Sequence, residues 1–390
     1  MAKQISSPRG MRDFLPVEKA RRDHYLELIL RVYKNRGFQS IETPAMENID
    51  RLISGQGGDN EKLAFQVLKR GEELEKATEE RSQLADLGLR YDLTVPLTRF
   101  YATNHAELPR VFKAIQTGPV WRAERPQKGR YRQFNQCDID IIGDDSTDAE
   151  LELLSASLEA LTAIGLTGAI IRINHRGFLT REMQNLGVED VPGVLITVDK
   201  LDKIGITGVE AELSERYDQA LAGRVGNWLN QEAEIPEELA AITESIDSSK
   251  LRFDKTLVRG MGYYTGAVFE IEHPDSGQSI GGGGRYDGMV GKWLGTDVSA
   301  VGISLGFERV MDLVEQSASE TQSLVIVYEQ IENALKVQEQ AIAEGFECRL
   351  EKKTKNLKTL LESMSKQGFR QFALLDNQQN LSELELKPLN

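Results

Sequence analysis

The stretch WRAERPQKGRYRQFNQCDID, residues 121–140, decides the fold that this sequence predicts. Apolar and β-branched residues before and within it predict two strands, at 111–123 and 133–142. The segment 124–132 between them is rich in arginine and contains a proline and a glycine, which is typical of a loop. It is longer than a tight hairpin turn. We therefore expect a strand–loop–strand unit here.

The polar residues of this unit gather on shared faces, because alternate side chains of a strand point the same way. Arg122 and Glu124 share one face, and Gln136, Asp138 and Asp140 share another. Two such strands side by side make a polar floor. Arg122 can offer a planar fork to a phosphate, while Gln136 and Asp140 can hold a cationic, hydrogen-bonding small molecule. The alternative is an ordinary salt-bridged hairpin.

A second polar segment, LVRGMGYYTGAVFE at 257–270, places Arg259 before two glycines and two tyrosines. Glycines let backbone or a ligand come close. Tyr263 and Tyr264 offer flat walls with polar tips. A strand with a bulge also explains this pattern.

A third pair of segments, GGGGRYD at 281–287 and VGISLGFERV at 301–310, combines a glycine run with Arg309. The glycines form neither a P-loop nor a Rossmann fingerprint, because the following residues and the spacing are wrong. Four consecutive glycines in a β-rich region indicate backbone packed against a flat ligand. Arg309 can reach a phosphate, or it can lie on a solvated helix face.

Three arginines far apart in the chain, Arg122, Arg259 and Arg309, suit a triphosphate bent over an antiparallel sheet. The residues alone allow a nucleotide-using enzyme and do not name its second substrate.

The composition argues against several classes of protein. The 390 residues are 40% hydrophobic and 28% charged, an ordinary globular balance that suits two or three domains. Cys137 and Cys348 are far apart and the four histidines lack metal-ligand spacing, so we expect no disulfide framework and no metal site built from cysteine or histidine. A G-x-S-x-G string at 302–306 has no later histidine to complete a hydrolase triad. No run has membrane length or the form of a signal peptide, and we expect a cytoplasmic protein without a membrane partner.

Charge is unevenly distributed. The formal net charge is −14, yet residues 110–132 carry seven basic side chains and one acidic, and residues 349–358 carry five and one. Two basic stretches on an acidic body suit a partner bound at two places. A solvated face explains either stretch taken alone.

The periodicity predicts an α+β fold with an insertion and a second domain. A polar surface excursion is predicted at 69–82 and a helix at 148–163. A helical, acidic region then interrupts the β-rich part. Strand–helix alternation after a polar linker predicts a small α/β domain that ends with a strand at 383–387. The predicted parts are a first core segment at 1–176, a helical insertion at 177–251, a second core segment at 252–314, a linker at 315–322 and a C-terminal domain at 323–390.

The motifs resemble those of the histidyl-tRNA synthetases. GPVWRAERPQKGRYRQFNQCDID looks like motif 2 of that family, RYDLTVPLTRF at 90–100 like its pocket strand, and LVRGMGYYTG like its histidine-specific motif. AVGISLGFERV at 300–310 is similar to class II motif 3, and PRGMRDFLP at 8–16 with IETPAME at 41–47 to the family's opening and motif 1. This resemblance implies the class II antiparallel sheet flanked by helices.

The resemblance also implies roles for individual residues. Arg259 and Arg122 would be catalytic, one on each side of the α-phosphate. ATP, with Mg²⁺, would be bound by Arg122, Glu124, Arg259 and Arg309. Histidine would be bound by Asp92, Thr94, Gln136, Asp140, Tyr263, Tyr264 and Tyr286. The tRNA acceptor end would be met by Arg125, Gln127, Lys128 and Arg130.

The implied reaction is activation of histidine to histidyl-adenylate and transfer to tRNA(His) by a homodimer, with the C-terminal domain meeting the anticodon. That domain is shorter than the family pattern, which bears on tRNA contact more than on adenylation. The rival function is that of a non-aminoacylating paralogue, a regulatory subunit of ATP phosphoribosyltransferase. A bare amino-acid-binding protein is a third possibility. The three phosphate-type arginines, the loop and the histidine motif favour the enzyme.

Overall fold

The computed structural model describes residues 5–53, 63–77, 84–127, 129–259, 263–315 and 322–389. The chain divides into two compact units, one of residues 1–12 and 27–315 and the other of residues 13–26 and 316–390. The functional residues predicted from the sequence belong to the first unit. The finer boundaries predicted above stay predictions.

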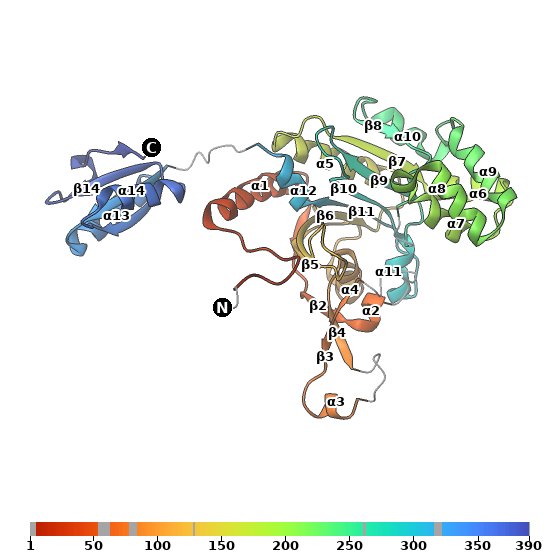
Figure 1. Cartoon of the computed structure of the whole chain (residues 1–390), viewed down its shortest axis with the longest axis horizontal. Coiled ribbons are helices and arrows are strands. Elements are labelled where there is room, and N and C mark those ends of the chain that lie inside the picture. The colour runs from red at the N-terminus through yellow and green to blue at the C-terminus, as the bar shows by residue number, and fades with distance from the viewer. Residues whose placement is uncertain are drawn as a thin grey trace. The chain divides into compact units, whose positions relative to one another are not determined.

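An eight-stranded sheet, counted over the described residues, forms the body of the first unit in the order β1-β5-β6-β11-β10-β9-β7-β8 (Figure 1). Neighbours in its interior are antiparallel, whereas the edge pairs β1–β5 and β7–β8 are parallel. The predicted antiparallel sheet is thereby confirmed, with a parallel pair at each edge. The strands are β1 (Gln39–Ile41), β5 (Phe112–Trp121), β6 (Gln133–Ile142), β7 (Ile170–His175), β8 (Leu251–Phe253), β9 (Ala267–Glu272), β10 (Gly281–Arg285) and β11 (Ala300–Gly306).

The predicted strand–loop–strand unit is confirmed as the antiparallel pair β5–β6. Strand β11 pairs with the other side of β6, so β6 lies between two strands. The residues opposite its polar side chains are small or polar, which leaves space above them. The register places Gln136 between Gly118 and Gly306, Asp138 between Gln116 and Ser304, and Asp140 between Ala114 and Gly302.

Helices cover both faces of this sheet. Helix α5 (Asp148–Ala163) packs on β6 and β11 and buries an apolar stripe that includes Leu153 and Leu161. On the opposite face α4 (Thr94–Asn104) packs against α11 (Asp287–Leu294), and both contribute to one core cluster with β5. Helix α12 (Phe307–Leu313) also packs on β6 and β11. Helix α1 (Pro16–Asn35) is divided between the two units, and its residues 27–35 belong to the first.

A buried ion pair ties α5 to the sheet. Arg285 at the end of β10 donates to both carboxylate oxygens of Glu150 at 2.6 Å, and a further N–H bonds the carbonyl of Ser146. Such a fork satisfies both charges at once, and removing one partner of a buried pair usually costs about 3–5 kcal/mol. The arginine after the glycine run is therefore structural.

The pocket strand predicted at 90–100 is wrong in its secondary structure. Strand β4 (Ala85–Leu89) ends before it, and α4 begins at Thr94. The Asp92 carboxylate accepts a hydrogen bond from the Val95 backbone N–H at 3.1 Å. A short acidic side chain in this place satisfies a free N–H of the first helical turn, and Pro96 is tolerated there for the same reason. The sequence instead forms a turn and a helix start.

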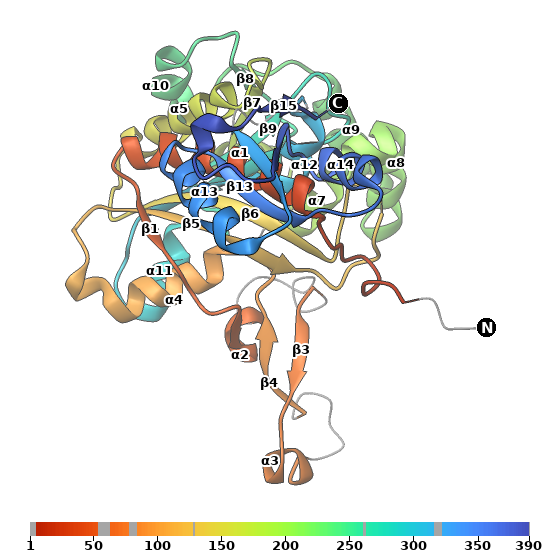
Figure 2. The ribbon, with the colours of Figure 1, turned by 90° about the vertical axis from the view of Figure 1, so that its left-hand side faces the viewer.

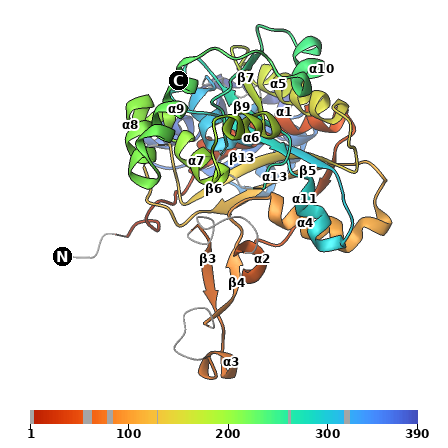
Figure 3. The same cartoon turned by 90° about the vertical axis from the view of Figure 1, so that its right-hand side faces the viewer.

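Strands β2 (Met46–Asn48), β4 and β3 (Phe65–Leu68) form a separate small sheet. Figures 2 and 3 show the β3–β4 hairpin projecting from the unit, with α3 (Glu72–Glu75) at its far end. Helix α2 (Ile49–Ile53) packs at its base through Ile49 and Leu52. Part of the predicted polar excursion, residues 78–82, lies outside the described residues.

The region predicted to be a helical insertion is helical. Its helices are α6 (Arg176–Asn185), α7 (Val191–Val198), α8 (Leu201–Arg216), α9 (Gln219–Asn230) and α10 (Glu237–Ser245). Helices α6 to α9 share a core in which Val194, Val209, Leu213 and Val225 are fully buried, whereas α10 packs on α5, β7 and β8.

The second unit contains the predicted strand–helix alternation. Its sheet has the order β13-β12-β14-β15 and comprises β12 (Ser323–Tyr328), β13 (Glu347–Lys352), β14 (Gln371–Leu375) and β15 (Lys387–Pro388). Helix α13 (Ile331–Ala343) and helix α14 (Leu357–Lys366) connect the parallel strands. The predicted strand at 383–387 is wrong, because a 3-10 turn at Leu381–Glu383 precedes a strand of only two residues.

Close strand packing in the glycine run gives a stability prediction. A Cβ at Gly283 would lie 1.9 Å from the carbonyl oxygen of Gly302, whereas nothing lies within 4 Å of one at the exposed Gly288 of α11. We expect Gly283→Ala to lower the unfolding free energy by about 1–3 kcal/mol, since backbone cannot yield as a side chain does. Gly288→Ala should be neutral or stabilising. Urea midpoints of the two variants, if equal, would contradict this account.

Candidate active site

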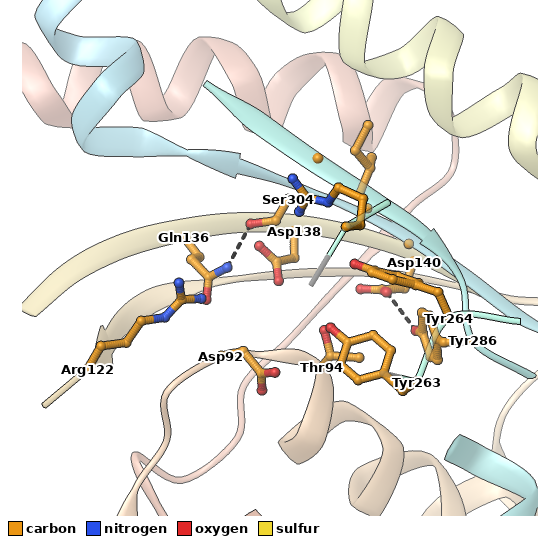
Figure 4. Close-up of a pocket in the computed structure, with 15 residues that line it drawn as sticks. Asp92, Thr94, Arg122, Gln136, Asp138, Asp140, Tyr263, Tyr264, Tyr286 and Ser304 are labelled. Atoms are coloured by element: carbon orange, nitrogen blue, oxygen red, sulfur yellow. Dashed lines mark hydrogen bonds between the residues drawn. The ribbon is translucent and has the colours of Figure 1, made fainter. Parts of the chain in front are cut away.

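A pocket on the α4 and α11 face of the main sheet collects residues from segments far apart in the chain (Figure 4). Every residue predicted to bind histidine lines it, together with two of the three arginines. The lining consists of Asp92, Thr94, Arg122, Gln136, Asp138, Asp140, Arg259, Tyr263, Tyr264, Gly282, Gly283, Tyr286, Gly302, Ile303 and Ser304. The structure thus brings the predicted set together, while the roles of its members stay predictions.

Three buried carboxyl groups distinguish this pocket. Asp92, Asp138 and Asp140 are at most 4% exposed. The Tyr286 hydroxyl donates to Asp140 Oδ1 at 2.6 Å. Within the described residues, Asp92 Oδ2, Asp138 Oδ1 and Gln136 Oε1 are buried without a hydrogen-bond partner. Unpaired buried acceptors are costly, so the pocket suits a ligand that brings several N–H donors.

Burial holds these carboxyl groups toward their neutral form. It raises the pKa of Asp92 to about 6 and that of Asp140 to about 7. The pKa of Asp138 is raised well above its ordinary value, first by burial and then by the neighbouring Asp140. Removal from water disfavours a charge unless an opposite charge is near. A cationic ligand would supply that opposite charge.

Tyrosines close one end of the pocket. The ring centroids of Tyr263 and Tyr264 are 4.7 Å apart, and those of Tyr263 and Tyr286 are 6.2 Å apart, both edge to face. Figure 4 shows the three rings together beside Asp140. This arrangement provides an aromatic wall with polar tips, which suits a small flat ring.

A larger cavity of about 350 Å³ adjoins this pocket and shares Arg122, Gln136, Arg259, Gly282 and Ser304 with it. Its volume lies within the usual range for small-molecule sites, ~300–1,000 Å³. Arg309 enters it from α12, as do Glu124 and Arg130 from the loop and Glu270 from β9. The three predicted phosphate-binding arginines therefore line one cavity.

The arginines are held separately and share an electrostatic environment. Arg122 Nε donates to the Tyr91 carbonyl at 3.1 Å, and Arg309 Nη1 donates to the Ser279 carbonyl at 2.5 Å. Burial lowers the pKa of Arg309, and the nearby Arg130, Arg122 and Arg259 lower it further. Like charges in one cavity repel unless an anion lies between them. The cavity suits a polyanion.

Arg259 reaches this cavity by an unusual backbone conformation. Its φ of 57° is the one positive φ among the described non-glycine residues. Its guanidinium passes over Gly282, where a Cβ would lie 2.7 Å from Nη1. Left-handed conformations of this kind cluster at functional sites. The glycine run therefore accommodates an arginine from another segment.

The predicted tRNA-contacting residues lie on the loop between β5 and β6. Arg125, Gln127 and Arg130 are exposed, and an isolated bridge joins Gln127 to Arg130. Lys128 lies outside the described residues. Exposure of these side chains leaves them accessible to a macromolecular partner.

Sequence reasoning missed several lining residues. Asp138 was placed on the correct face but given no role, although alternation alone put it between Gln136 and Asp140. Ser304 and Glu270 carried no local signal, because only strand pairing brings them to the site. Gln136 Nε2 donates to the Ser304 hydroxyl at 2.9 Å, which orients the amide.

Comparisons with known proteins agree with one another. The histidyl-tRNA synthetase family model matches residues 10–310. A histidine–tRNA ligase of Leifsonia xyli subsp. xyli is 49% identical over 100% of this chain and 99% of its own. The crystal structure of histidyl-tRNA synthetase from Nostoc sp. PCC 7120 has a TM-score of 0.76 at 26% identity, covering 99% of this chain and 95% of that one.

A further structure shares the fold alone. It is described as an ATP phosphoribosyltransferase regulatory subunit/histidyl-tRNA synthetase from Bacillus halodurans, and has a TM-score of 0.72 at 20% identity, covering 93% of this chain and 97% of that one. The described helices include none with the length and apolar character of a membrane span.

The buried Asp140 gives a prediction of pH dependence. Its pKa is about 7 in the folded chain against an ordinary value of 3.8. Between these values the folded state keeps a proton that the unfolded chain has lost, so stability falls as the pH rises. We expect Asp140→Asn to reduce the loss of unfolding free energy between pH 5 and pH 8 by on the order of 2 kcal/mol. Asn still accepts from Tyr286.

The measurement is a series of urea unfolding curves at several pH values. Asp145→Asn, which removes an exposed carboxylate nearby, is the control and should keep the wild-type slope. An unchanged slope in Asp140→Asn would mean that this carboxyl is ionised in the folded chain.

Proposed function

Because this chain belongs to the histidyl-tRNA synthetase family, we propose that it activates histidine with ATP and transfers the histidyl group to tRNA(His). The observation that carries the proposal is the meeting of an acid-lined, tyrosine-walled pocket with an arginine-lined cavity across Gly282 and Ser304. One pocket suits a small cation with N–H donors, and the adjoining cavity suits a polyphosphate.

The proposed histidine site uses the unpaired acceptors of Asp92 and Gln136 together with Asp140, which already accepts from Tyr286. The ammonium and imidazole N–H groups of histidine would donate to Asp92, Gln136 and Asp140, with Thr94 at the start of α4 beside them. A side chain without ring nitrogens would leave these buried acceptors unpaired, and a site built this way rejects such analogues strongly. The ring of Tyr263 would lie against the imidazole, flanked by Tyr264 and Tyr286.

The proposed first step is in-line attack of a histidine carboxylate oxygen on the α-phosphorus of ATP. A P–O bond forms to histidine, the bond to the β-phosphate oxygen breaks, and pyrophosphate leaves with the electron pair. Arg122 and Arg259 would stabilise charge at the α-phosphate, and Arg309 would hold the γ-phosphate. Guanidiniums fixed before the reaction need no reorganisation as charge develops. Exposed Glu124 would lie at the nucleotide end.

Magnesium enters this proposal as part of the MgATP substrate. Among the described residues, acidic, histidine and cysteine side chains gather in no group of three or more able to hold a metal ion. Mg²⁺ is commonly bound by one or two carboxylates together with substrate phosphates. The exposed carboxylate of Glu124, which lines the larger cavity, is a group available to it.

The proposed second step uses the loop and the C-terminal unit. Arg125, Gln127 and Arg130, with Lys128, would contact the acceptor end of tRNA(His), whose terminal ribose hydroxyl attacks the adenylate carbonyl and releases AMP. The small α/β unit would contact the anticodon. We further propose a homodimer that acts in the cytoplasm. The regulatory-subunit alternative is not favoured, because this chain resembles a histidine–tRNA ligase over its whole length.

Histidine-dependent exchange between pyrophosphate and ATP tests the first step. Arg259→His should lower the exchange rate by about 10²-fold or more, since it removes a preorganised charge from the α-phosphate, while leaving the fold intact. Arg181→His, at an exposed arginine paired with Glu238, should exchange at the wild-type rate. Comparable rates in both variants would remove Arg259 from the reaction. Charging of tRNA(His) transcripts by the wild type then tests transfer.

Gln136→Ala tests the division between the two pockets. Loss of the amide should weaken histidine binding by about 5- to 100-fold, the usual effect of removing a hydrogen bond in a buried site. ATP binding should change much less, because the other cavity contacts remain. Isothermal titrations with each ligand measure both affinities. Equal weakening would place Gln136 outside the amino-acid pocket.

A further inference from the structure

One carboxylate, Glu270 on β9, lies between two arginines. Its Oε2 accepts from Arg172 Nη1 at 3.2 Å, and its Oε1 accepts from Arg259 Nη1 at 3.4 Å. The side chain is 19% exposed, and Arg172 is only 9% exposed. Both carboxylate oxygens are thus engaged, one on each side.

Sheet register explains this placement. Across β7 and β9 Arg172 is the direct partner of Glu270, and across β9 and β10 the partner of Glu270 is Gly282. Directly opposed residues share a face. Arg259 passes over Gly282, so its guanidinium meets Glu270 at the position where the next strand has no side chain.

Arg172 is itself firmly held. Its Nε donates to Asp254 Oδ2 at 2.7 Å, its Nη2 also contacts that carboxylate, and its Nη1 donates to Glu272 at 2.9 Å. The arginine therefore acts as a fixed donor to Glu270. A chain of ion pairs runs from Asp254 through Arg172 and Glu270 to Arg259.

Arg259 needs such support for a physical reason. Its guanidinium shares a cavity with Arg122, Arg130 and Arg309, which repel it until a polyphosphate arrives. Its long side chain carries ~2 kcal/mol of rotamer entropy, and its backbone φ is unfavourable. A fixed carboxylate beside Arg259 offsets the repulsion from the other arginines and restricts the rotamers of its side chain.

Resting on the proposed function, we propose that Glu270 is a positioning residue that aims Arg259 at the α-phosphate, with Arg172 fixing Glu270. Neither residue need touch the reacting atoms. Glu270 would preorganise the Arg259 guanidinium before the reaction. Removal of its carboxylate should therefore lower kcat and leave the affinity for substrates nearly unchanged.

The test is pyrophosphate exchange with Glu270→Gln and its matched control Glu272→Gln. Glu272 also contacts Arg172 but is not a partner of Arg259 in the described ion pairs. We expect Glu270→Gln to lower kcat by about 10- to 100-fold, as small misplacements at a reacting centre do, with KM for ATP and histidine within about threefold and an unchanged melting temperature. Glu272→Gln should stay within about twofold of wild type in kcat.

A double variant tests whether the effect passes through Arg259. With Arg259→Lys as background, Glu270→Gln should add no more than about a twofold loss, because coupled residues are non-additive. Multiplicative losses would overturn the proposal. So would recovery of Glu270→Gln activity at high Mg²⁺, which would make the carboxylate a metal ligand.

Two further outcomes separate this inference from the proposed function. Absence of histidine-dependent exchange in the wild type would reject the function itself. An active wild type with equal kcat in Glu270→Gln and Glu272→Gln would reject only the role of Glu270. Should Glu270→Gln fail to fold, Arg172→Lys keeps the charge but loses the fork, and the same kcat-specific loss is expected of it.

Discussion

A row of residues paired across the main sheet is the constraint on which the site depends. Each member opposes the next on the neighbouring strand, so all share one face and their spacing is fixed by the sheet. The row runs Arg252, Arg172, Glu270, Gly282, Ser304, Asp138, Gln116 from β8 to β5. Neighbouring strands lie about 4.8 Å apart. This spacing sets the distance between the ion pair of Arg172 with Glu270 at one end of the row and the pocket around Asp138 at the other.

The row also explains how opposite kinds of charge coexist in adjoining pockets. Burial raises the pKa of the carboxyl groups of Asp138 and Asp140 on β6, which disfavours their charged form. The guanidiniums of the larger cavity are compensated by Glu270 and by backbone carbonyls. Gly282 and Ser304 separate the two and contribute little bulk. A cationic ligand in the acid-lined pocket and a polyanionic ligand in the arginine-lined cavity would therefore each supply the opposite charge that the side chains lack.

Local patterns predicted much of this architecture, and long-range pairing accounts for the rest. Alternation in 133–142 and the apolar periodicity of 148–163 are properties of short segments, so β6 and α5 were predicted almost to the residue. The turn at Asp92 was predicted as strand, because a resemblance in residue type does not reveal backbone conformation. The two-residue β15 follows from pairing with β14 rather than from propensity.

The site shows the same division. Gln136 and Asp140 could be chosen from alternation. Arg122, Arg259 and Arg309 could be grouped by their residue type and by the family resemblance, but only the strand pairing of the sheet brings them to one cavity. No role was predicted for Glu270 or Ser304, because their neighbours across the sheet are distant in the chain. Arg172 lies 98 residues before Glu270, and the strand partner of Ser304 is Asp138.

Cys137 carries a consequence for chemical labelling. It stands between Gln136 and Asp138 on β6, yet its side chain points to the other face, because alternate side chains of a strand do so, and it is fully buried. Burial raises the pKa of this thiol, and a protonated, enclosed sulfur does not react with alkylating reagents. Modification of Cys137 therefore requires local opening of the core on that face, so its alkylation rate reports how often the sheet beneath the site loses its covering.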